Sequence, residues 1–118
     1  MSVSLIRHQG KEIVLVDYSR CKLPEETLVV LDQCEAFLLS YKNDALILID
    51  VSGAPGSTEY MARAKQVSKK VNHKVHKRAL VGITGLKKIM FQGYSRIVNG
   101  NNRAFDNREK AIEFLVSA

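Results

Sequence analysis

The sequence predicts a single α/β domain, because three short apolar runs alternate with segments of helical periodicity. The runs are Ile13–Val16, Ala45–Ile49 and Ala79–Ile83. They are apolar at both odd and even positions, which is typical of central strands in a parallel sheet that helices cover on both faces. The chain has 118 residues and shows neither a linker nor an internal repeat. We therefore expect residues 1–118 to form one domain.

The first elements are predicted to be a hairpin and a helix. Ser2–Arg7 is expected to form an edge strand, joined by a turn at His8–Lys11 to the first central strand, so that the two strands pair antiparallel. The first helix is expected to start near Pro24, because proline suits the first turn of a helix. Its apolar stripe follows helical spacing: Val30, Cys34, Phe37, Leu38 and Tyr41.

The second helix follows the middle strand after a turn at Gly53–Gly56. Either Ser57 or Thr58 is able to cap its first turn. The buried stripe expected for this helix is Tyr60, Ala64, Val67 and Val71.

The last third of the chain predicts a helix, a strand and a helix. Leu86–Val98 is expected to be helical, and Arg103–Phe105 to be a short strand. Asp106 and Glu109 have the spacing of a capping box before the final helix. The order β-β-α-β-α-β-α-β-α gives about five strands in a mixed, mostly parallel sheet, with four helices.

The charge is divided unevenly along the chain. The net charge is +6, yet residues 1–60 hold 5 basic and 9 acidic side chains (−4) and residues 61–118 hold 13 basic and 3 acidic (+10). No Asp or Glu occurs from Tyr60 through Phe105. We expect Lys69, Lys70, Lys74 and Lys77 to lie on the outer face of the second helix, giving the molecule a positive surface.

Several partner classes and compartments are disfavoured by the sequence. A basic stretch can bind nucleic acid, but aromatic side chains that stack on bases are few (four Phe, four Tyr, no Trp). No signal peptide or apolar run of membrane-spanning length is visible. The two cysteines, Cys21 and Cys34, are expected to be reduced thiols. These observations predict a cytoplasmic protein without a nucleic-acid function.

Motifs for cofactors, metals and catalysis are also missing. The sequence has neither a G-x-x-x-x-G-K-[ST] phosphate loop nor a G-x-G-x-x-G fingerprint. His73 and His76 lie among lysines and have no nearby carboxylate that would complete a metal site. The one candidate catalytic pair is Asp17 and Asp50, which end strands expected to be neighbours, although such aspartates more often cap turns. We expect no enzymatic activity, cofactor or metal.

Ligands of open α/β sheets bind at the carboxyl ends of the strands, and this edge holds the candidate site. A Thr-Gly turn followed by two lysines in the first turn of a helix is suited to an anion, because free N–H groups and ammonium charges point the same way. The alternative is a plain turn with solvated lysines. The candidate anion-binding residues are Ser52, Gly53, Thr84, Gly85, Lys87 and Lys88.

The arrangement of these segments resembles the STAS superfamily, and in particular small stand-alone bacterial STAS/CRAL-TRIO-like proteins of unassigned function. The resemblance rests on the segments Ile47–Gly53, Val81–Lys88 and Arg103–Asp106, and on the final helix with Ala111 and Leu115. It covers the chain from about Gly10 to Val116. It implies a STAS-like fold and a non-enzymatic binding or regulatory module.

The resemblance implies three modes of action, which stay open at this stage. A module of this class recognises a protein partner or an anionic ligand. An anti-sigma-factor-antagonist-like regulator is switched by phosphorylation, and the matching positions here are Ser57 and Thr58. A CRAL-TRIO-like protein binds a lipid or another small amphiphile. The apolar helix expected over Leu86–Val98 is a candidate for such a pocket or for a homodimer contact.

Overall fold

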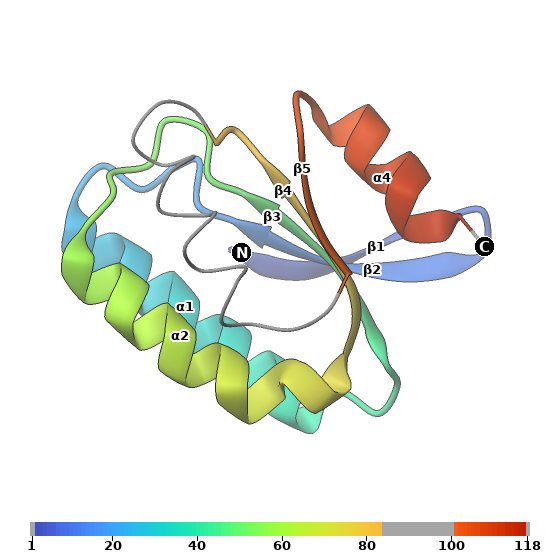
Figure 1. Cartoon of the computed structure of the whole chain (residues 1–118), viewed down its shortest axis with the longest axis horizontal. Helices are drawn as coiled ribbons and strands as arrows, with labels where there is room; N and C mark the ends of the chain where they lie inside the picture. The colour runs from blue at the N-terminus through green and yellow to red at the C-terminus, as the bar shows by residue number, and fades with distance from the viewer. Residues whose placement is uncertain (1, 84–100, 118) are drawn as a thin grey trace.

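The computed structural model describes residues 2–83 and 101–117 and shows one five-stranded sheet between helices (Figure 1). The elements in chain order are β1 (Val3–His8), β2 (Lys11–Asp17), α1 (Pro24–Ser40), β3 (Ala45–Asp50), α2 (Thr58–Val71), the short 3-10 helix η1 (Asn72–Lys74), β4 (Val75–Val81), β5 (Asn101–Phe105) and α4 (Arg108–Val116). The predicted α/β class is confirmed.

The sheet has the order β1-β2-β3-β4-β5. β1 pairs antiparallel with β2, and the other three pairings are parallel. The predicted hairpin is confirmed: His8 pairs with Lys11, and Gln9 and Gly10 have φ of 51° and 77°. Positive φ at both central residues gives the tight turn that matches the twist of the strands.

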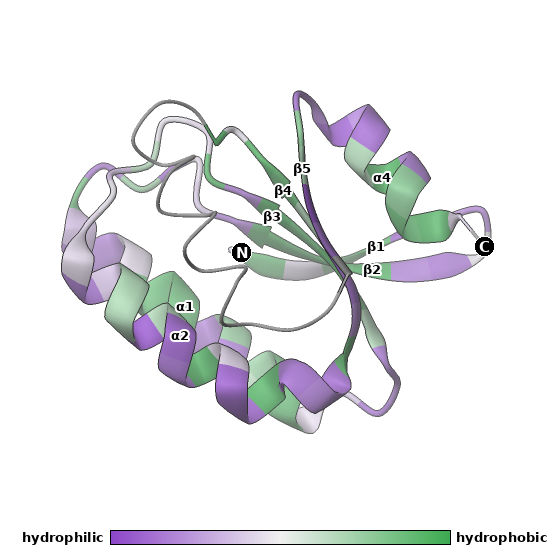
Figure 2. Ribbon diagram, viewed as in Figure 1, coloured by the Kyte–Doolittle hydropathy of each residue, from purple (hydrophilic) through white to green (hydrophobic). Residues whose placement is uncertain are grey.

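Helices cover both faces of the sheet. α1 and α2 lie together on one face, and α4 lies on the other (Figure 1). Side chains alternate along each strand, so Val14 and Ile47 pack in the core beneath α1 and α2, whereas Ile13 and Leu48 pack beneath α4. Figure 2 shows hydrophobic residues along β3 and β4 and many hydrophilic residues along α2.

The helix ends follow the predicted signals with one correction. Pro24 is the first residue of α1, and the Glu26 carboxylate accepts the Leu23 N–H at 2.8 Å. Ser57 caps α2, its Oγ accepting the Tyr60 N–H at 3.0 Å. The predicted capping box at Asp106 is wrong, because Asn107 is the N-cap of α4 and its Oδ1 accepts the Lys110 N–H at 2.9 Å.

The prediction that Lys77 lies on the outer face of the second helix is wrong. β4 begins at Val75, four residues before the predicted strand, so Lys77 and its neighbour Arg78 are strand residues and both are buried. Lys77 Nζ faces α4 and donates hydrogen bonds to the carbonyl oxygens of Phe114 and Ser117, with N···O distances of 3.0 and 2.8 Å. The exposed positive charge is therefore smaller than the sequence predicts.

Three of the four expected helices lie within the described residues. The other, predicted over Leu86–Val98, falls outside them, as does its expected homodimer contact. β5 begins at Asn101, two residues before the predicted strand. No helix within residues 2–83 and 101–117 is long and apolar enough to cross a membrane.

The carboxyl ends of β3 and β4 come into close contact at Gly82. The Val51 N–H donates to the Val81 carbonyl at 2.9 Å, which draws the turn after β3 against the end of β4. Gly82 has φ of 87°, and a Cβ built there would lie within 2.6 Å of Ser52 Cα. Only glycine combines this φ with so close an approach.

We predict that Gly82→Ala destabilises the protein more than Gly53→Ala does. Gly53 also has a positive φ, 72°, but a Cβ there would meet nothing within 4 Å. Backbone strain alone costs about 1–3 kcal/mol, and the collision at Gly82 adds about 2 kcal/mol. Urea unfolding measures both losses, and equal losses would contradict the close approach.

Candidate functional site

Two aspartates meet where β2 and β3 end. Asp17 and Asp50 are register partners in the parallel pairing of these strands, which confirms that the predicted pair are neighbours. Each accepts hydrogen bonds from the turn that follows it: Asp17 Oδ1 from Ser19 N and Oγ at 2.8 and 2.6 Å, and Asp50 Oδ1 from Ser52 N at 2.9 Å. The two carboxylates thus shape the turns at this edge of the sheet.

Arg108, the first residue of α4, reaches both aspartates. Its Nε donates to Asp50 Oδ2 at 2.8 Å, and its Nη2 lies 3.5 Å from Asp17 Oδ2. A cation in the first turn of a helix is unfavourable because the helix dipole is positive there. The two carboxylates offset that repulsion, and they also attach α4 to the carboxyl ends of β2 and β3.

Both aspartates are held in the ionised form. Burial raises the pKa of Asp50, but hydrogen bonds from Ser52 and Arg108 outweigh it, so its pKa is lowered. The pKa of Asp17 is lowered in the same way, because hydrogen bonds from Ser19 and the charge of Arg108 outweigh its burial. The pKa of Arg108 is raised, chiefly by its hydrogen bond to Asp50.

This arrangement is poorly suited to acid–base catalysis. Such catalysis by two carboxyl groups needs their pKa values pushed apart, so that one keeps a proton near neutral pH. Here hydrogen bonds and one shared cation lower the pKa of both. Asp17, Asp50 and Arg108 together attach α4 to the ends of β2 and β3, and we call these three residues the clasp.

The predicted anion-binding residues are divided between described and undescribed parts of the chain. Ser52 and Gly53 lie in the turn after β3, where the Ser52 amide already donates to Asp50 and Gly53 is exposed. The other members, Thr84, Gly85, Lys87 and Lys88, lie outside the described residues. The anion site at this turn stays a prediction.

The predicted phosphorylation positions lie at the start of α2. Ser57 is half-buried because its Oγ caps the helix, whereas Thr58 and Glu59 are exposed. Ala54, in the middle of the preceding turn, is buried, and its N–H donates to the Val51 carbonyl at 3.0 Å. The turn between β3 and α2 is therefore anchored at both ends and exposed at Gly53, Gly56 and Thr58.

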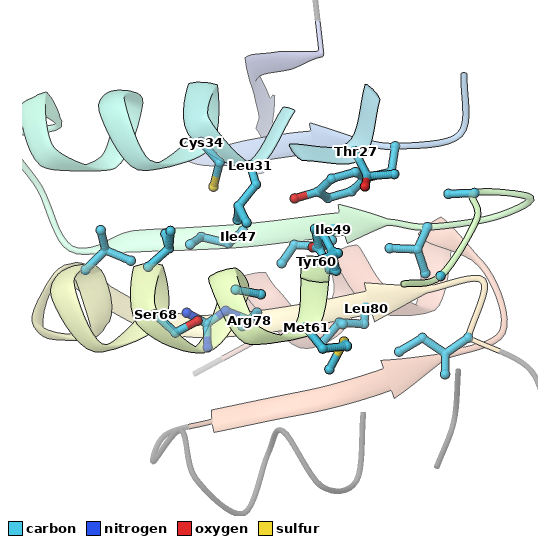
Figure 3. Close-up of a pocket in the computed structure, with 18 of the residues that line it drawn as sticks. Thr27, Leu31, Cys34, Ile47, Ile49, Tyr60, Met61, Ser68, Arg78 and Leu80 are labelled. Atoms are coloured by element: carbon cyan, nitrogen blue, oxygen red, sulfur yellow. The ribbon is translucent and has the colours of Figure 1, made fainter. Parts of the chain in front are cut away.

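A cavity of about 120 Å³ lies between the sheet and the helices α1 and α2. Figure 3 shows side chains from all four neighbouring elements around it, with Leu31 and Cys34 from α1, Met61 from α2 and Ile49 from β3. Its walls are overwhelmingly apolar. The charged side chain among the described lining residues is Arg78 of β4, which is 3% exposed.

The thiol that lines this cavity is unreactive at neutral pH. Burial raises the pKa of Cys34 to about 11, although the nearby charge of Arg78 acts in the opposite direction. The thiolate is the nucleophilic form of cysteine, so Cys34 has little nucleophilic character. Both cysteines are free and buried.

Sequence reasoning missed both Arg108 and Arg78. A signal for Arg108 was present, because an arginine directly after the N-cap of a helix needs a nearby carboxylate. For Arg78 the signal was its place directly before the apolar run Ala79–Ile83. If the strand includes Arg78, strand alternation places its side chain on the same face as that of Leu80, beneath a helix layer. The uncertain start of β4 concealed that placement.

No protein-family model and no curated protein matches the sequence. Solved structures similar to this one include two with 16% sequence identity each. The first is an uncharacterised DUF3478-family protein with a SpoIIAA-like fold from Shewanella loihica PV-4, with a TM-score of 0.74 over 96% of this chain and 91% of the other. The second is an anti-sigma-factor antagonist (STAS) domain protein from Planctomyces limnophilus, with a TM-score of 0.58 over 98% of both chains. The protein therefore has the STAS-like, or SpoIIAA-like, fold that the sequence predicts.

We predict that Arg108→Met lowers the free energy of unfolding by about 1–3 kcal/mol near neutral pH, because it leaves two carboxylates unpaired. An aspartate whose pKa is lowered by folding stabilises the protein above the unfolded pKa, about 3.9, and this contribution is lost as the pH falls through the folded value. The difference from wild type should therefore shrink in acid.

The control variant is Lys110→Met, which removes an exposed cation from the same turn of α4. It should change stability by less than about 0.5 kcal/mol. Denaturant unfolding of the three proteins at several pH values measures these effects. A loss for Arg108→Met that is independent of pH would contradict the clasp.

Proposed function

We propose that the protein is a non-enzymatic regulatory module that recognises a protein partner with the turn between β3 and α2. The observation that carries this proposal is the form of that turn. It is exposed at Gly53, Gly56 and Thr58 and anchored at Ser52 and Ser57 by the hydrogen bonds described above. A preorganised exposed loop loses little conformational entropy on binding.

The clasp supports a function without catalysis. Asp17 and Asp50 form a carboxylate pair at the carboxyl ends of β2 and β3, and Arg108 forms ion pairs with both. Cys34 is a buried thiol with a raised pKa. Neither group provides an activated nucleophile or a poised acid and base.

The two similar structures share the fold of this protein, and a regulatory function is proposed from that shared fold by analogy. The protein from Planctomyces limnophilus is described as an anti-sigma-factor antagonist domain protein. By analogy, this chain acts by binding another protein. We place it in the cytoplasm, where two buried free thiols stay reduced.

Phosphorylation at the start of α2 is the proposed switch of this surface. A phosphate on Ser57 or Thr58 would lie at the N-terminus of the helix, where the dipole favours negative charge. On Thr58, which is exposed, it would change the charge of the recognition turn without disturbing the cap. A partner bound there would be released by the added charge.

A second candidate function is the binding of a small amphiphile, and a separate observation favours it. The apolar cavity beneath α1 and α2 is large enough for a small organic molecule. This function uses the interior of the helix layer and is compatible with a partner at the edge of the sheet.

We predict that Ser57→Asp weakens partner binding and leaves the fold intact. Aspartate caps a helix as well as serine does, so the change adds a negative charge at the recognition turn with little cost in stability. Ser40→Asp is the control, because Ser40 is an exposed serine at the C-terminal end of α1, a different helix. Affinity capture from the host, quantified by mass spectrometry, measures partner retention.

We expect wild type and Ser40→Asp to capture equal amounts of a partner protein. We expect Ser57→Asp to capture about tenfold less of that partner, or still less. Equal retention by all three proteins would contradict the proposed surface. The absence of any protein enriched by wild type would contradict the proposed function itself.

A further inference from the structure

The cavity between α1, α2 and the sheet contains a buried positive charge that no carboxylate of the described residues balances. Arg78 projects from β4 to this cavity and is 3% exposed. Among the described residues its guanidinium forms no ion pair with a carboxylate, and no Asp or Glu occurs in the sequence from Tyr60 through Phe105. A buried cation without an anion is unfavourable, so such a site attracts one.

The nearest acidic element does not supply the missing anion. Glu35 of α1, one residue after the cavity residue Cys34, pairs instead with Lys70 of α2, at 3.6 Å. Asp32 of α1 pairs with Arg63 of α2. These ion pairs join the two helices, and none of their four residues lines the cavity, whereas Arg78 does.

A second buried donor, the side-chain amide of Asn102, lies next to Arg78. Nη1 of Arg78 donates to Asn102 Oδ1 at 3.0 Å, which fixes the orientation of that amide. The Nδ2 of Asn102 is also buried and has no hydrogen-bond partner among the described residues. A guanidinium has five N–H donors in a planar fork, so the two groups together offer more donors than the hydrogen bonds to described residues use.

We propose that this cavity binds a small apolar monocarboxylate, with its apolar body between α1 and α2 and its carboxylate on Arg78. The proposal rests on the second candidate function and names its ligand class. Arginine binds carboxylates through two parallel hydrogen bonds, and among the described residues Asn102 accepts one hydrogen bond from this guanidinium. The apolar walls exclude the strongly hydrated anions that carry no apolar group.

The volume of the cavity limits the size of the ligand. It is about 120 Å³, and an apolar cavity of about 150 Å³ in a globular protein binds benzene. The apolar body of the ligand is therefore limited to about the size of one aromatic ring or a short alkyl chain, and the full chain of a membrane lipid is excluded. Benzoate is a suitable probe, and benzyl alcohol is its uncharged counterpart.

The test is a calorimetric titration of benzoate and benzyl alcohol into the wild type and into two variants. Arg78→Met removes the buried cation and keeps an unbranched apolar side chain, and replacing an unpaired buried charge in this way seldom impairs folding. Arg103→Met is the matched control, because Arg103 lies on β5 over the Phe114 ring, away from the cavity. Thermal unfolding confirms that each variant is folded.

The proposal predicts that wild type and Arg103→Met bind benzoate about tenfold or more tightly than benzyl alcohol, and that Arg78→Met loses this preference but still binds the alcohol. Equal binding of both probes to wild type would contradict the proposed role of Arg78, but it would still support the binding of small amphiphiles. Binding of neither probe would overturn both.

A filled cavity gives an independent check of location. Ala64→Leu places a larger apolar side chain among the lining residues of α2. It should abolish the binding of both probes in a folded protein. Unchanged binding of benzoate by this variant would place the ligand elsewhere and overturn the proposal.

Discussion

The contact of Arg108 with Asp17 and Asp50 is the interaction on which the carboxyl edge of the sheet depends. It joins the ends of two neighbouring parallel strands to the start of the last helix. Without the arginine, two carboxylates would lie side by side at the ends of their strands and repel each other. Because the arginine contacts both, the two carboxylates stay ionised side by side and α4 is attached to the ends of β2 and β3.

Two neighbouring residues of β4 explain how the two faces of the sheet differ. Lys77 faces α4 and donates hydrogen bonds to the carbonyl oxygens at the C-terminal end of that helix, so its charge stabilises the helix terminus. Arg78 faces the opposite way, into an apolar cavity beneath α1 and α2. Among the described residues, the cation on the first face is satisfied by helix carbonyl groups, whereas the cation on the second face has no carboxylate partner. This difference is why we propose ligand binding on the second face.

Much of the fold was predictable from the sequence, and the site was predictable only in part. Apolar runs such as Ala45–Ile49 and caps such as Ser57 depend on local sequence, so the order of elements along the chain, the starts of α1 and α2 and the proximity of Asp17 and Asp50 could be deduced. The order of the strands within the sheet could not be deduced, because it depends on pairings between segments far apart in the chain. Arg108 and Arg78 could not be placed in this way, because their roles depend on contacts between segments far apart in the chain. The start of β4 was mislocated because Lys77 and Arg78 are charged residues that occupy buried positions, which hydrophobic periodicity does not detect.

The ionisation of Asp17 and Asp50 is measured most directly by carboxyl carbon NMR across a pH titration. If Arg108 and the hydrogen bonds of the turns stabilise the ionised pair, both aspartates titrate below the usual value of the side chain, about 3.9, and neither carries a proton near neutral pH. A titration in which one of them has a pKa near neutrality would contradict a non-catalytic clasp, because that carboxyl would then be poised as a general acid.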